Sequence, residues 1–387
     1  MTWNWQQDAW PEFAWDPRKL ARAEALFTEG AGVVIGLSRR LSADERASLT
    51  IELMSHEAVD TSAIEGEPLD RDSVQSSIRR HLGLEGDHRR TSPAEAGIAQ
   101  MMVDLYEQAA APLTEATLFN WHRLVTNGRT DLKDIGQYRT HADPMQIVSG
   151  PLHAPKVHFE APPSAEVPPQ MARFWTWLEQ SGPQGPKPLP PITRAGIAHL
   201  WFESIHPFED GNGRVGRAIS EKVLALGLAS PAITGMASTL LKHRKTYYAE
   251  LERAHRDLEI TDWLAWFAAK TLESQKRTLA QVEFILDKAR LLDRVRGQVN
   301  SRQEKALLRL FAAGPEGFIG GLSASNYMRI TDAPPATATR DLTALVGLGA
   351  LLRTGENKAT RYRLAIETEP SVTLEIADVL KSALGFD

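Results

Sequence analysis

The spacing of apolar residues along the chain predicts a mainly helical protein. In the clearest case the apolar residues recur at i, i+3, i+4 and i+7, which places them on one face of a helix: Ala198, Trp201, Phe202 and Ile205. Capping boxes, in which a serine is followed three residues later by a glutamate, mark helix starts at Ser42 and Ser92. The first of these helices is expected to run through about Val59. Further helices are expected over residues 114–127, 167–179 and 193–205.

A different pattern occupies residues 136–166, where prolines, glycines and β-branched residues interrupt the helical period. Two short runs, residues 147–148 and 157–159, flank the turn-forming sequence Ser149-Gly150-Pro151. This arrangement predicts a β-hairpin.

The end of the chain changes pattern again after about Asp293. Three helical patterns precede two short strand-like runs that bracket a turn: residues 303–313, 323–329 and 336–348, then 351–354 and 360–364. Three helices followed by a hairpin are typical of a winged helix. We therefore expect a mainly α protein with three domains: an N-terminal helical domain (1–105), a central helical domain with the β-hairpin (106–292), and an α+β winged-helix domain with a tail (293–387).

The composition narrows the classes of function. The 387 residues are 42% hydrophobic and 24% charged with a net charge of −5, as in an ordinary globular protein, and nothing global points to nucleic acid or membrane binding. The absence of cysteine excludes disulfides, thiolate metal sites and a cysteine nucleophile. No apolar run approaches the roughly 20 residues of a membrane span, and the N-terminus lacks the regions of a signal peptide, so we expect a cytoplasmic protein.

The most informative segment is HPFEDGNGRVGR, residues 206–217. Pro207 disfavours helical geometry at His206, so one helix should end there, and a new helix should begin near Asn212. The glycine-containing loop between them brings free N–H groups to a helix N-terminus, where anions bind.

The side chains of this segment extend the same argument. Arg214 and Arg217, spaced i and i+3, suit phosphate oxygens, and Asp210 offers a hard oxygen ligand for Mg²⁺ bound to phosphates. His206 lies where an imidazole could accept a proton from an attacking hydroxyl. Together these groups predict phosphoryl-transfer chemistry. The alternative is a capped loop with surface arginines.

The segment also resembles the signature of the Fic family, HxFx(D/E)GNGRxxR, at every fixed position. The resemblance implies a helical core in which a protein hydroxyl attacks the α-phosphate of ATP, AMP is transferred and pyrophosphate leaves. In that family the residue matching His206 is the general base and the residue matching Asp210 holds Mg²⁺. The resemblance assigns Arg214 to the β-phosphate side and Arg217 to the γ-phosphate. The resemblance also places the Gly211-Asn212-Gly213 backbone and the Asn212 amide against the phosphates.

Two flanking segments resemble further parts of Fic proteins. The hairpin at about residues 147–159, preceded by residues 136–139, resembles the flap on which a target protein docks by strand addition. Residues 242–248 resemble the lining of the nucleoside pocket, which makes Tyr247 and Tyr248 candidates for ATP binding. For both tyrosines, simple core packing is the alternative.

Upstream, Thr61-Ser62-Ala63-Ile64-Glu65-Gly66 fits the family's inhibitory motif, (S/T)xxxE(G/N). Its position resembles that in class II Fic proteins, in which an N-terminal helix inhibits the enzyme's own active site. Here that helix would be formed by about residues 42–66. The resemblance implies that Glu65 pairs with Arg217 in a bidentate contact and removes the cation needed by the γ-phosphate. The alternative is a helix end capped by Gly66. The N-terminal stretch also resembles a domain often found ahead of Fic cores.

The C-terminal domain leaves its partner open. Residues 300–364 hold nine Lys and Arg against five Asp and Glu, a mild positive excess. DNA binding through the helix that opens near Thr337, with phosphate contacts from the hairpin arginines, is one hypothesis. Docking of a protein or homodimerisation is the other, and the acidic tail (Glu367, Glu369, Glu375) favours it.

The sequence thus predicts an ATP- and Mg²⁺-dependent protein adenylyltransferase that Glu65 inhibits. The alternatives are a Fic enzyme that removes AMP or transfers another nucleotide or phosphate group, and a winged-helix transcription regulator that senses ATP. A zinc site on His199, Glu203 and His206 is a minor alternative, because their spacing is not His-Glu-x-x-His.

Overall fold

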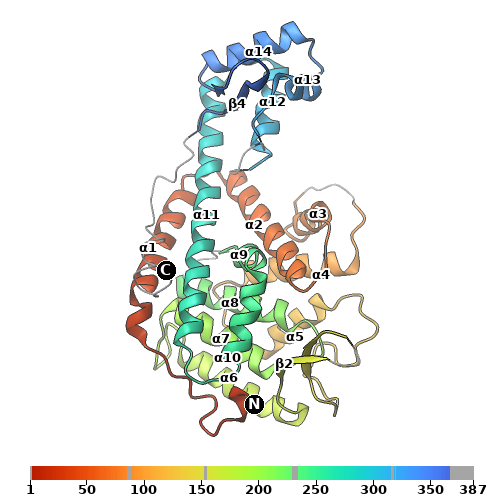
Figure 1. Cartoon of the computed structure of the whole chain (residues 1–387), viewed down its shortest axis with the longest axis vertical. Helices are drawn as coiled ribbons and strands as arrows, with labels where there is room; N and C mark the ends of the chain where they lie inside the picture. Colours follow the sequence, from red (N-terminus) through yellow and green to blue (C-terminus); the bar gives the residue numbers. More distant parts are fainter. Residues whose placement is uncertain are drawn as a thin grey trace. The chain divides into compact units, whose positions relative to one another are not determined.

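The structure is a computed structural model that describes residues 2–84, 89–151, 155–228, 234–314, 318 and 320–366. These residues are mostly helical, with two antiparallel two-stranded sheets (Figure 1), which confirms the expected mainly α fold. Among them, no helix combines the length and the apolar character that crossing a membrane requires.

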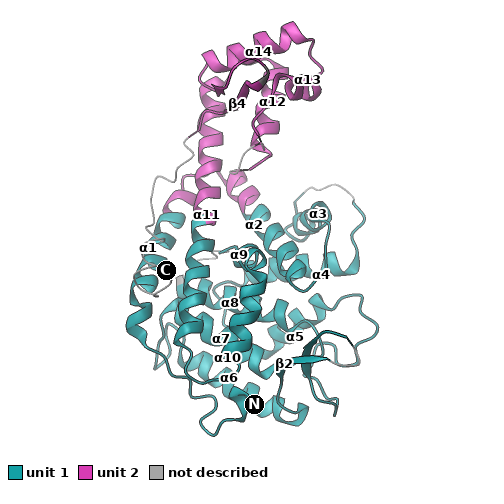
Figure 2. Ribbon diagram, in the orientation of Figure 1, with its two compact units in different colours: residues 1–35, 50–276, 374–387 teal, residues 36–49, 277–373 magenta. Residues whose placement is uncertain are grey.

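The chain forms two compact units (Figure 2). Among the described residues, the first contains those up to 35 together with 50–276, and the second contains 36–49 together with those from 277 onward. The expected boundary near residue 105 does not separate these units, because the N-terminal helices and the central helices belong to the same one. The three-domain division therefore stays a prediction.

The helices of the first unit follow one another along the chain, and three of them (α1, α2 and α11) also contain residues of the second unit. They are α1 (Pro17–Ser38), α2 (Ala43–Ile64), α3 (Arg71–His81), α4 (Pro93–Glu107), α5 (Glu115–Val125), α6 (Val167–Gln180), α7 (Pro191–Ile205), α8 (Asn212–Leu228), α9 (Met236–Lys242), α10 (Arg244–Ala254) and α11 (Thr261–Val295), with 3₁₀ turns η1 (Asn4–Gln6) and η2 (Ser164–Glu166).

Helix α7 is the centre of this unit, where it packs between α6 and α8. Every residue from Ile192 to Ile205 is buried, whereas the sequence predicted a single buried stripe. The reason lies partly at Gly196, where a Cβ would stand 2.7 Å from the Leu264 side chain of α11. The missing side chain lets α11 cover a face of α7 that the apolar pattern did not mark.

The aromatic N-terminal stretch packs on the same core. Trp10 and Phe13 make edge-on contacts with Trp201 of α7, at centroid distances of 6.1 and 5.9 Å. Trp3 and Trp10 are 8% and 6% exposed, so this segment adds to the core of the unit.

Helix α2 begins as predicted but ends later. The Ser42 hydroxyl and amide both contact the Glu45 carboxylate at 2.8 Å, completing the capping box. The helix continues beyond Val59 to Ile64 and stops where Gly66 adopts a left-handed conformation with φ +85°. This turn decides where the residues after Ile64 point.

The predicted β-hairpin is present as β1 (Gln146–Ser149) and β2 (Lys156–Glu160), antiparallel with Ile147 opposite Phe159. All four residues of β1 are exposed, so its outer edge is open to a further strand. Residues 152–154 of the expected flap lie outside the described residues.

The second unit contains the predicted helices and hairpin in the predicted order. They are α12 (Ser301–Phe311), α13 (Ala324–Thr331), α14 (Pro335–Gly347), β3 (Leu351–Thr354), η3 (Asn357–Ala359) and β4 (Arg361–Leu364). Leu307, Tyr327 and Leu342 are fully buried in its core. The winged-helix assignment itself stays a prediction, and the acidic tail (Glu367, Glu369, Glu375) lies outside the described residues.

Candidate active site

The loop between α7 and α8 has the geometry that its sequence predicts. α7 ends at Ile205, and His206 adopts a left-handed conformation with φ +50° while its N–H donates to the Phe202 carbonyl at 2.9 Å. Gly211, with φ +81°, makes the second turn, and α8 begins at Asn212. The loop N–H groups therefore gather at the start of α8, where the helix dipole favours an anion.

The side chain of Asn212 closes the loop. Its amide Oδ1 accepts from the Phe208 N–H at 2.9 Å, its Nδ2 donates to the Phe208 carbonyl at 2.8 Å, and the residue is 2% exposed. Both polar atoms are thus used to close the loop. The side chain shapes the anion site from within, and a contact of the amide with phosphate stays a prediction.

His206 is held as a neutral imidazole. Burial lowers the pKa of His206 to about 4, so its ring carries no charge at neutral pH. Its backbone carbonyl accepts from Arg139 Nε at 2.8 Å, which fixes the residue in its strained conformation. A neutral ring beside a cavity is able to accept a proton.

Glu203 lies beneath this histidine. Its carboxylate is 3.6 Å from His206 Nδ1, and burial raises the pKa of Glu203 to about 8, so the group is protonated at neutral pH. The expected hydrogen-bonding role of His199 is confirmed, since its ring contacts the Tyr247 hydroxyl at 2.7 Å and Ser220 Oγ at 3.1 Å. Among the described residues, no group of three His, Asp or Glu side chains could hold a metal, which leaves the zinc alternative without support.

Glu65 and Arg217 are paired, as predicted, but through one nitrogen only. Glu65 Oε1 lies 2.7 Å from Arg217 Nη2, while Thr61 accepts from Nε through its hydroxyl at 2.7 Å and from Nη2 through its carbonyl at 2.8 Å. Thr61 therefore takes the place that a carboxylate would have in a side-on bidentate contact through Nε and Nη2. Although burial opposes the charge, the Glu65 carboxylate raises the pKa of Arg217.

A close approach explains why glycine stands at position 213. A Cβ there would be 2.2 Å from Glu65 Oε1, so the carboxylate lies directly against the backbone of the loop. Glu65 thus covers both the second arginine and part of the anion-binding loop.

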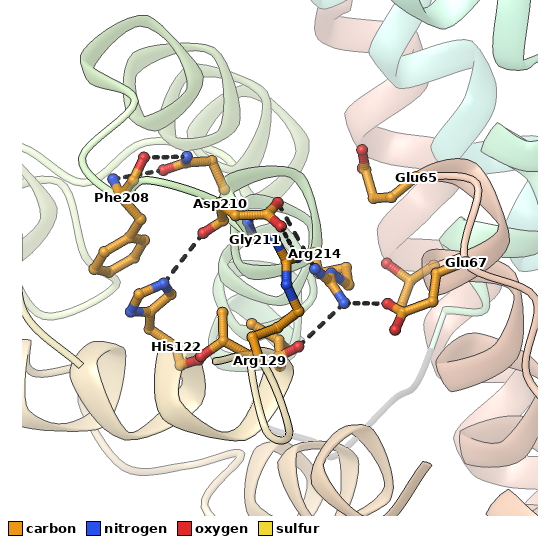
Figure 3. A network of polar contacts seen from close by, with 12 residues as sticks. Glu65, Glu67, His122, Arg129, Phe208, Asp210, Gly211 and Arg214 are labelled. Carbon is orange, nitrogen blue, oxygen red and sulfur yellow. Dashed lines mark hydrogen bonds and ion pairs between the residues drawn. The ribbon is translucent and has the colours of Figure 1, made fainter. Parts of the chain in front are cut away.

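The other two predicted phosphate-site residues also have partners (Figure 3). Arg214 Nη1 contacts the Glu67 carboxylate and donates to the Val125 carbonyl at 3.1 Å. Asp210 Oδ2 contacts Arg129 Nη1, and its Oδ1 is 3.9 Å from Arg214 Nη2. Arg129 and Glu67 were not singled out from the sequence. Only the alternation of Glu65, Gly66 and Glu67 could have suggested the second glutamate, and no local signal marks Arg129.

A cavity of about 600 Å³ opens above this network, and its walls come from the loop, the flap and α10. Tyr248 is 38% exposed, and its hydroxyl is 3.3 Å from Glu65 Oε2. Tyr247 is 1% exposed and its hydroxyl is used by His199, so the core-packing alternative fits that residue better. The lining includes His206, Asp210, Gly213, Ile147, His158 and Tyr248.

The flap is tied to the far wall of the cavity by a chain of polar contacts. Ser149 Oγ of β1 lies 2.6 Å from His158 Nε2 of β2, and His158 Nδ1 lies 2.7 Å from Glu252 Oε2 of α10. These contacts hold the predicted docking edge over the cavity.

Comparison with known proteins agrees with this geometry. Residues 112–224 match the family described as "Fic/DOC family", and residues 3–84 match "Domain of unknown function (DUF4172)". The match to the Fic/DOC family ends within α8 and contains the whole loop between α7 and α8.

Relatives and a solved structure give the same result. The chain is 26% identical over 201 residues to "Protein adenylyltransferase fic-1" of Caenorhabditis briggsae (50% of this chain, 35% of that protein). It is 31% identical over 156 residues to "Protein adenylyltransferase Fic" of Culex quinquefasciatus (38% and 28%). It thus spans about a third of the length of these relatives.

The fold is similar to that of a Fic family protein from Desulfovibrio desulfuricans G20, whose crystal structure superposes with a TM-score of 0.52 at 22% identity, covering 92% of this chain and 98% of that one. Sequence motif, loop geometry and fold point to the same group of proteins. Residues 112–224 therefore form a Fic domain.

Proposed function

We propose that the protein is an adenylyltransferase that transfers AMP from ATP to a hydroxyl of a target protein, and that Glu65 restrains it. The observation that carries the proposal is the neutral, buried His206 at the edge of an anion-binding helix start that also presents two buried arginines. The relatives are named protein adenylyltransferases, and these names support the same reaction.

The chemistry follows from this arrangement. The target hydroxyl loses its proton to His206 and its oxygen forms a bond to the α-phosphorus, while the bond from that phosphorus to the bridging oxygen of pyrophosphate breaks. Arg214 and Arg217 would neutralise the outer phosphates, and the N–H groups of the loop would hold the inner one. The open edge of β1 would register the target segment over the cavity.

Mg²⁺ fits this site as part of an ATP complex. Asp210 is a half-exposed carboxylate on the cavity wall, and among the described residues it belongs to no group of three potential metal ligands, so phosphate oxygens and water would complete the shell. When bound, the ion would neutralise charge on the phosphates. Asp210 is the residue that would hold it.

Restraint by Glu65 is supported by its position. The carboxylate pairs with the cation expected to bind the γ-phosphate and lies against Gly213 of the anion loop. Suppression of the competent state about 100-fold would need roughly 3 kcal/mol. Because the same carboxylate lines the cavity, where it could orient water, removal of AMP from modified protein is the second candidate activity.

The proposal is tested by transfer of label from α-³²P-ATP with Mg²⁺, comparing wild type, Glu65→Gly and Glu65→Gly/His206→Ala. Strong labelling of protein by the single variant, weak labelling by wild type and none by the double variant would support both roles. If the single variant labels as weakly as wild type, Glu65 is not the restraint or AMP transfer is not the reaction. Repeating the assay with γ-label and with AMP-modified protein separates those outcomes.

For the C-terminal unit we propose protein docking or homodimerisation over DNA binding. The exposed face of α14 carries one cation, Arg340, among small and hydroxyl-bearing residues, whereas DNA affinity grows with the number of phosphates neutralised. A gel shift with random duplex DNA that shows no complex at low salt would agree. A salt-dependent complex would favour the regulator alternative.

A further inference from the structure

Two charge pairs engage the phosphate-site groups that Glu65 does not touch. Glu67 contacts Arg214, and Arg129 contacts Asp210 (Figure 3). The cation and the anion named here are the ones expected to bind a nucleotide phosphate and its metal ion. Each therefore already has a partner of opposite charge from outside the family signature.

Glu67 owes its position to the end of α2. The left-handed turn at Gly66 lets the Glu67 N–H donate to the Ser62 carbonyl at 3.0 Å, so the chain folds back over the last turn of the helix. Glu65 and Glu67 therefore belong to the same turn, but their carboxylates contact two different arginines, Arg217 and Arg214. The arginine side chains are 6% exposed at Arg214 and 2% at Arg217, whereas the glutamates are 39% and 29% exposed, so the glutamates cover the cations from the outside.

Arg129 is set against Asp210 by a third residue. Its Nε and Nη2 donate to the two Asp131 oxygens at 2.7 and 2.6 Å, which leaves Nη1 directed at Asp210 Oδ2. The contact with Asp131, followed by that with Asp210, raises the pKa of Arg129, so the guanidinium remains charged. A divalent cation and this guanidinium would compete for the same carboxylate oxygen.

We propose that Glu67 and Arg129 form a second latch on the phosphate site, independent of Glu65, which nucleotide phosphate and its divalent cation must displace in order to bind. The inference rests on the proposed function, because it assumes that Arg214 and Asp210 receive phosphate and metal. Since Arg214 is assigned to the β-phosphate and Arg217 to the γ-phosphate, the two glutamates oppose different parts of the same ligand. Removal of Glu65 alone leaves the second latch closed.

Nucleotide binding, measured by calorimetry with Mg²⁺ and without any target protein, tests the Glu67 half. The variants are Glu67→Gln, Glu65→Gly, the double variant, and Glu52→Gln as the matched control. Glu52 lies on α2, the helix that Glu65 and Glu67 follow, and also pairs with an arginine, Arg71 at 2.7 Å, away from the site. The probes are ATP, ADP and AMP.

Glu67→Gln should tighten ADP and ATP about 3- to 10-fold, the range of a partly exposed ion pair, and leave AMP unchanged because AMP lacks the β-phosphate. Glu65→Gly should tighten ATP more than ADP, and the double variant should bind ATP more tightly than either single variant. Equal ADP affinities for Glu67→Gln and the Glu52→Gln control would overturn this half. If no variant binds ATP or ADP at all, the proposed function fails with it, which is a distinguishable result.

The Arg129 half is tested by the Mg²⁺ requirement of ADP binding. Arg129→Gln should lower the Mg²⁺ concentration for half-maximal ADP binding about 3- to 10-fold, because the ion no longer competes with a guanidinium. Arg71→Gln is the matched control. An unchanged Mg²⁺ requirement in Arg129→Gln, with ADP still bound and the melting temperature of wild type retained, would show that Arg129 does not compete for Asp210.

Discussion

The Glu65 carboxylate reaches Arg217 through a single nitrogen, Oε1 to Nη2 at 2.7 Å, while Thr61 of the preceding helix α2 accepts from Nε and Nη2. One helix therefore both orients the second signature arginine and neutralises it. Displacing Glu65 alone would leave the guanidinium fixed by Thr61 and facing the phosphate site. The restraint and the positioning of this cation are separable.

Replacing Thr61 by valine should destabilise the protein by about 1–3 kcal/mol, because Arg217 Nε is buried and would lose its acceptor. Thr61→Ser keeps the hydroxyl and should retain most of that stability. Urea unfolding of the two variants gives the comparison. Equal losses in both would contradict this expectation, because the methyl group would then contribute as much as the hydrogen bond.

Glu203 should make stability depend on pH. Its folded-state pKa of about 8 is above its ordinary value of 4.5, so its contribution is fully present below about pH 4.5 and is lost as the pH rises toward 8. The glutamine in Glu203→Gln cannot ionise. The free energy of unfolding of this variant, relative to that of wild type, should therefore rise between pH 5 and pH 8, by at most about 1.4 kcal/mol per pH unit. Unfolding at pH 5, 6.5 and 8 measures the difference. A difference that stays constant with pH would contradict a protonated Glu203.

Asn212→Ala should cost about 1–3 kcal/mol of stability and weaken ATP binding about 10-fold or more, because two hydrogen bonds that close the loop are lost. Thermal melting and nucleotide titration on the same sample separate the two effects. If ATP affinity falls while the melting temperature is unchanged, the amide touches nucleotide directly instead.

Glu252→Gln should loosen the flap by weakening its contact with His158. Hydrogen exchange of the amides in residues 146–149 and 156–160 should rise roughly 3- to 10-fold, as expected when a partly exposed ion pair is removed. Asp262→Asn is the control, since Asp262 is 73% exposed and 3.8 Å from Arg253, away from the flap. Equal exchange in the two variants would mean that the hairpin is held by its other contacts.

The features that depend only on neighbouring residues could be predicted from the amino-acid sequence. Pro207 ends α7 at Ile205, the glycines of the loop turn the chain, and Arg214 and Arg217 follow on the first turn of α8, all from local geometry. The pairing of Glu65 with Arg217 was available from the sequence only through the resemblance to Fic proteins. The contact itself joins segments that are far apart in the chain.

The contacts between distant segments became visible only in the folded structure. The Glu67–Arg214 and Arg129–Asp210 pairs, the inward Asn212 amide and the complete burial of α7 depend on which helices meet, and spacing along the chain does not record that. The single-nitrogen contact of Glu65 has the same cause, because Thr61 and Glu65 approach Arg217 together from one helix end. Local periodicity fixes which residues share an element, whereas packing between elements fixes which charges meet.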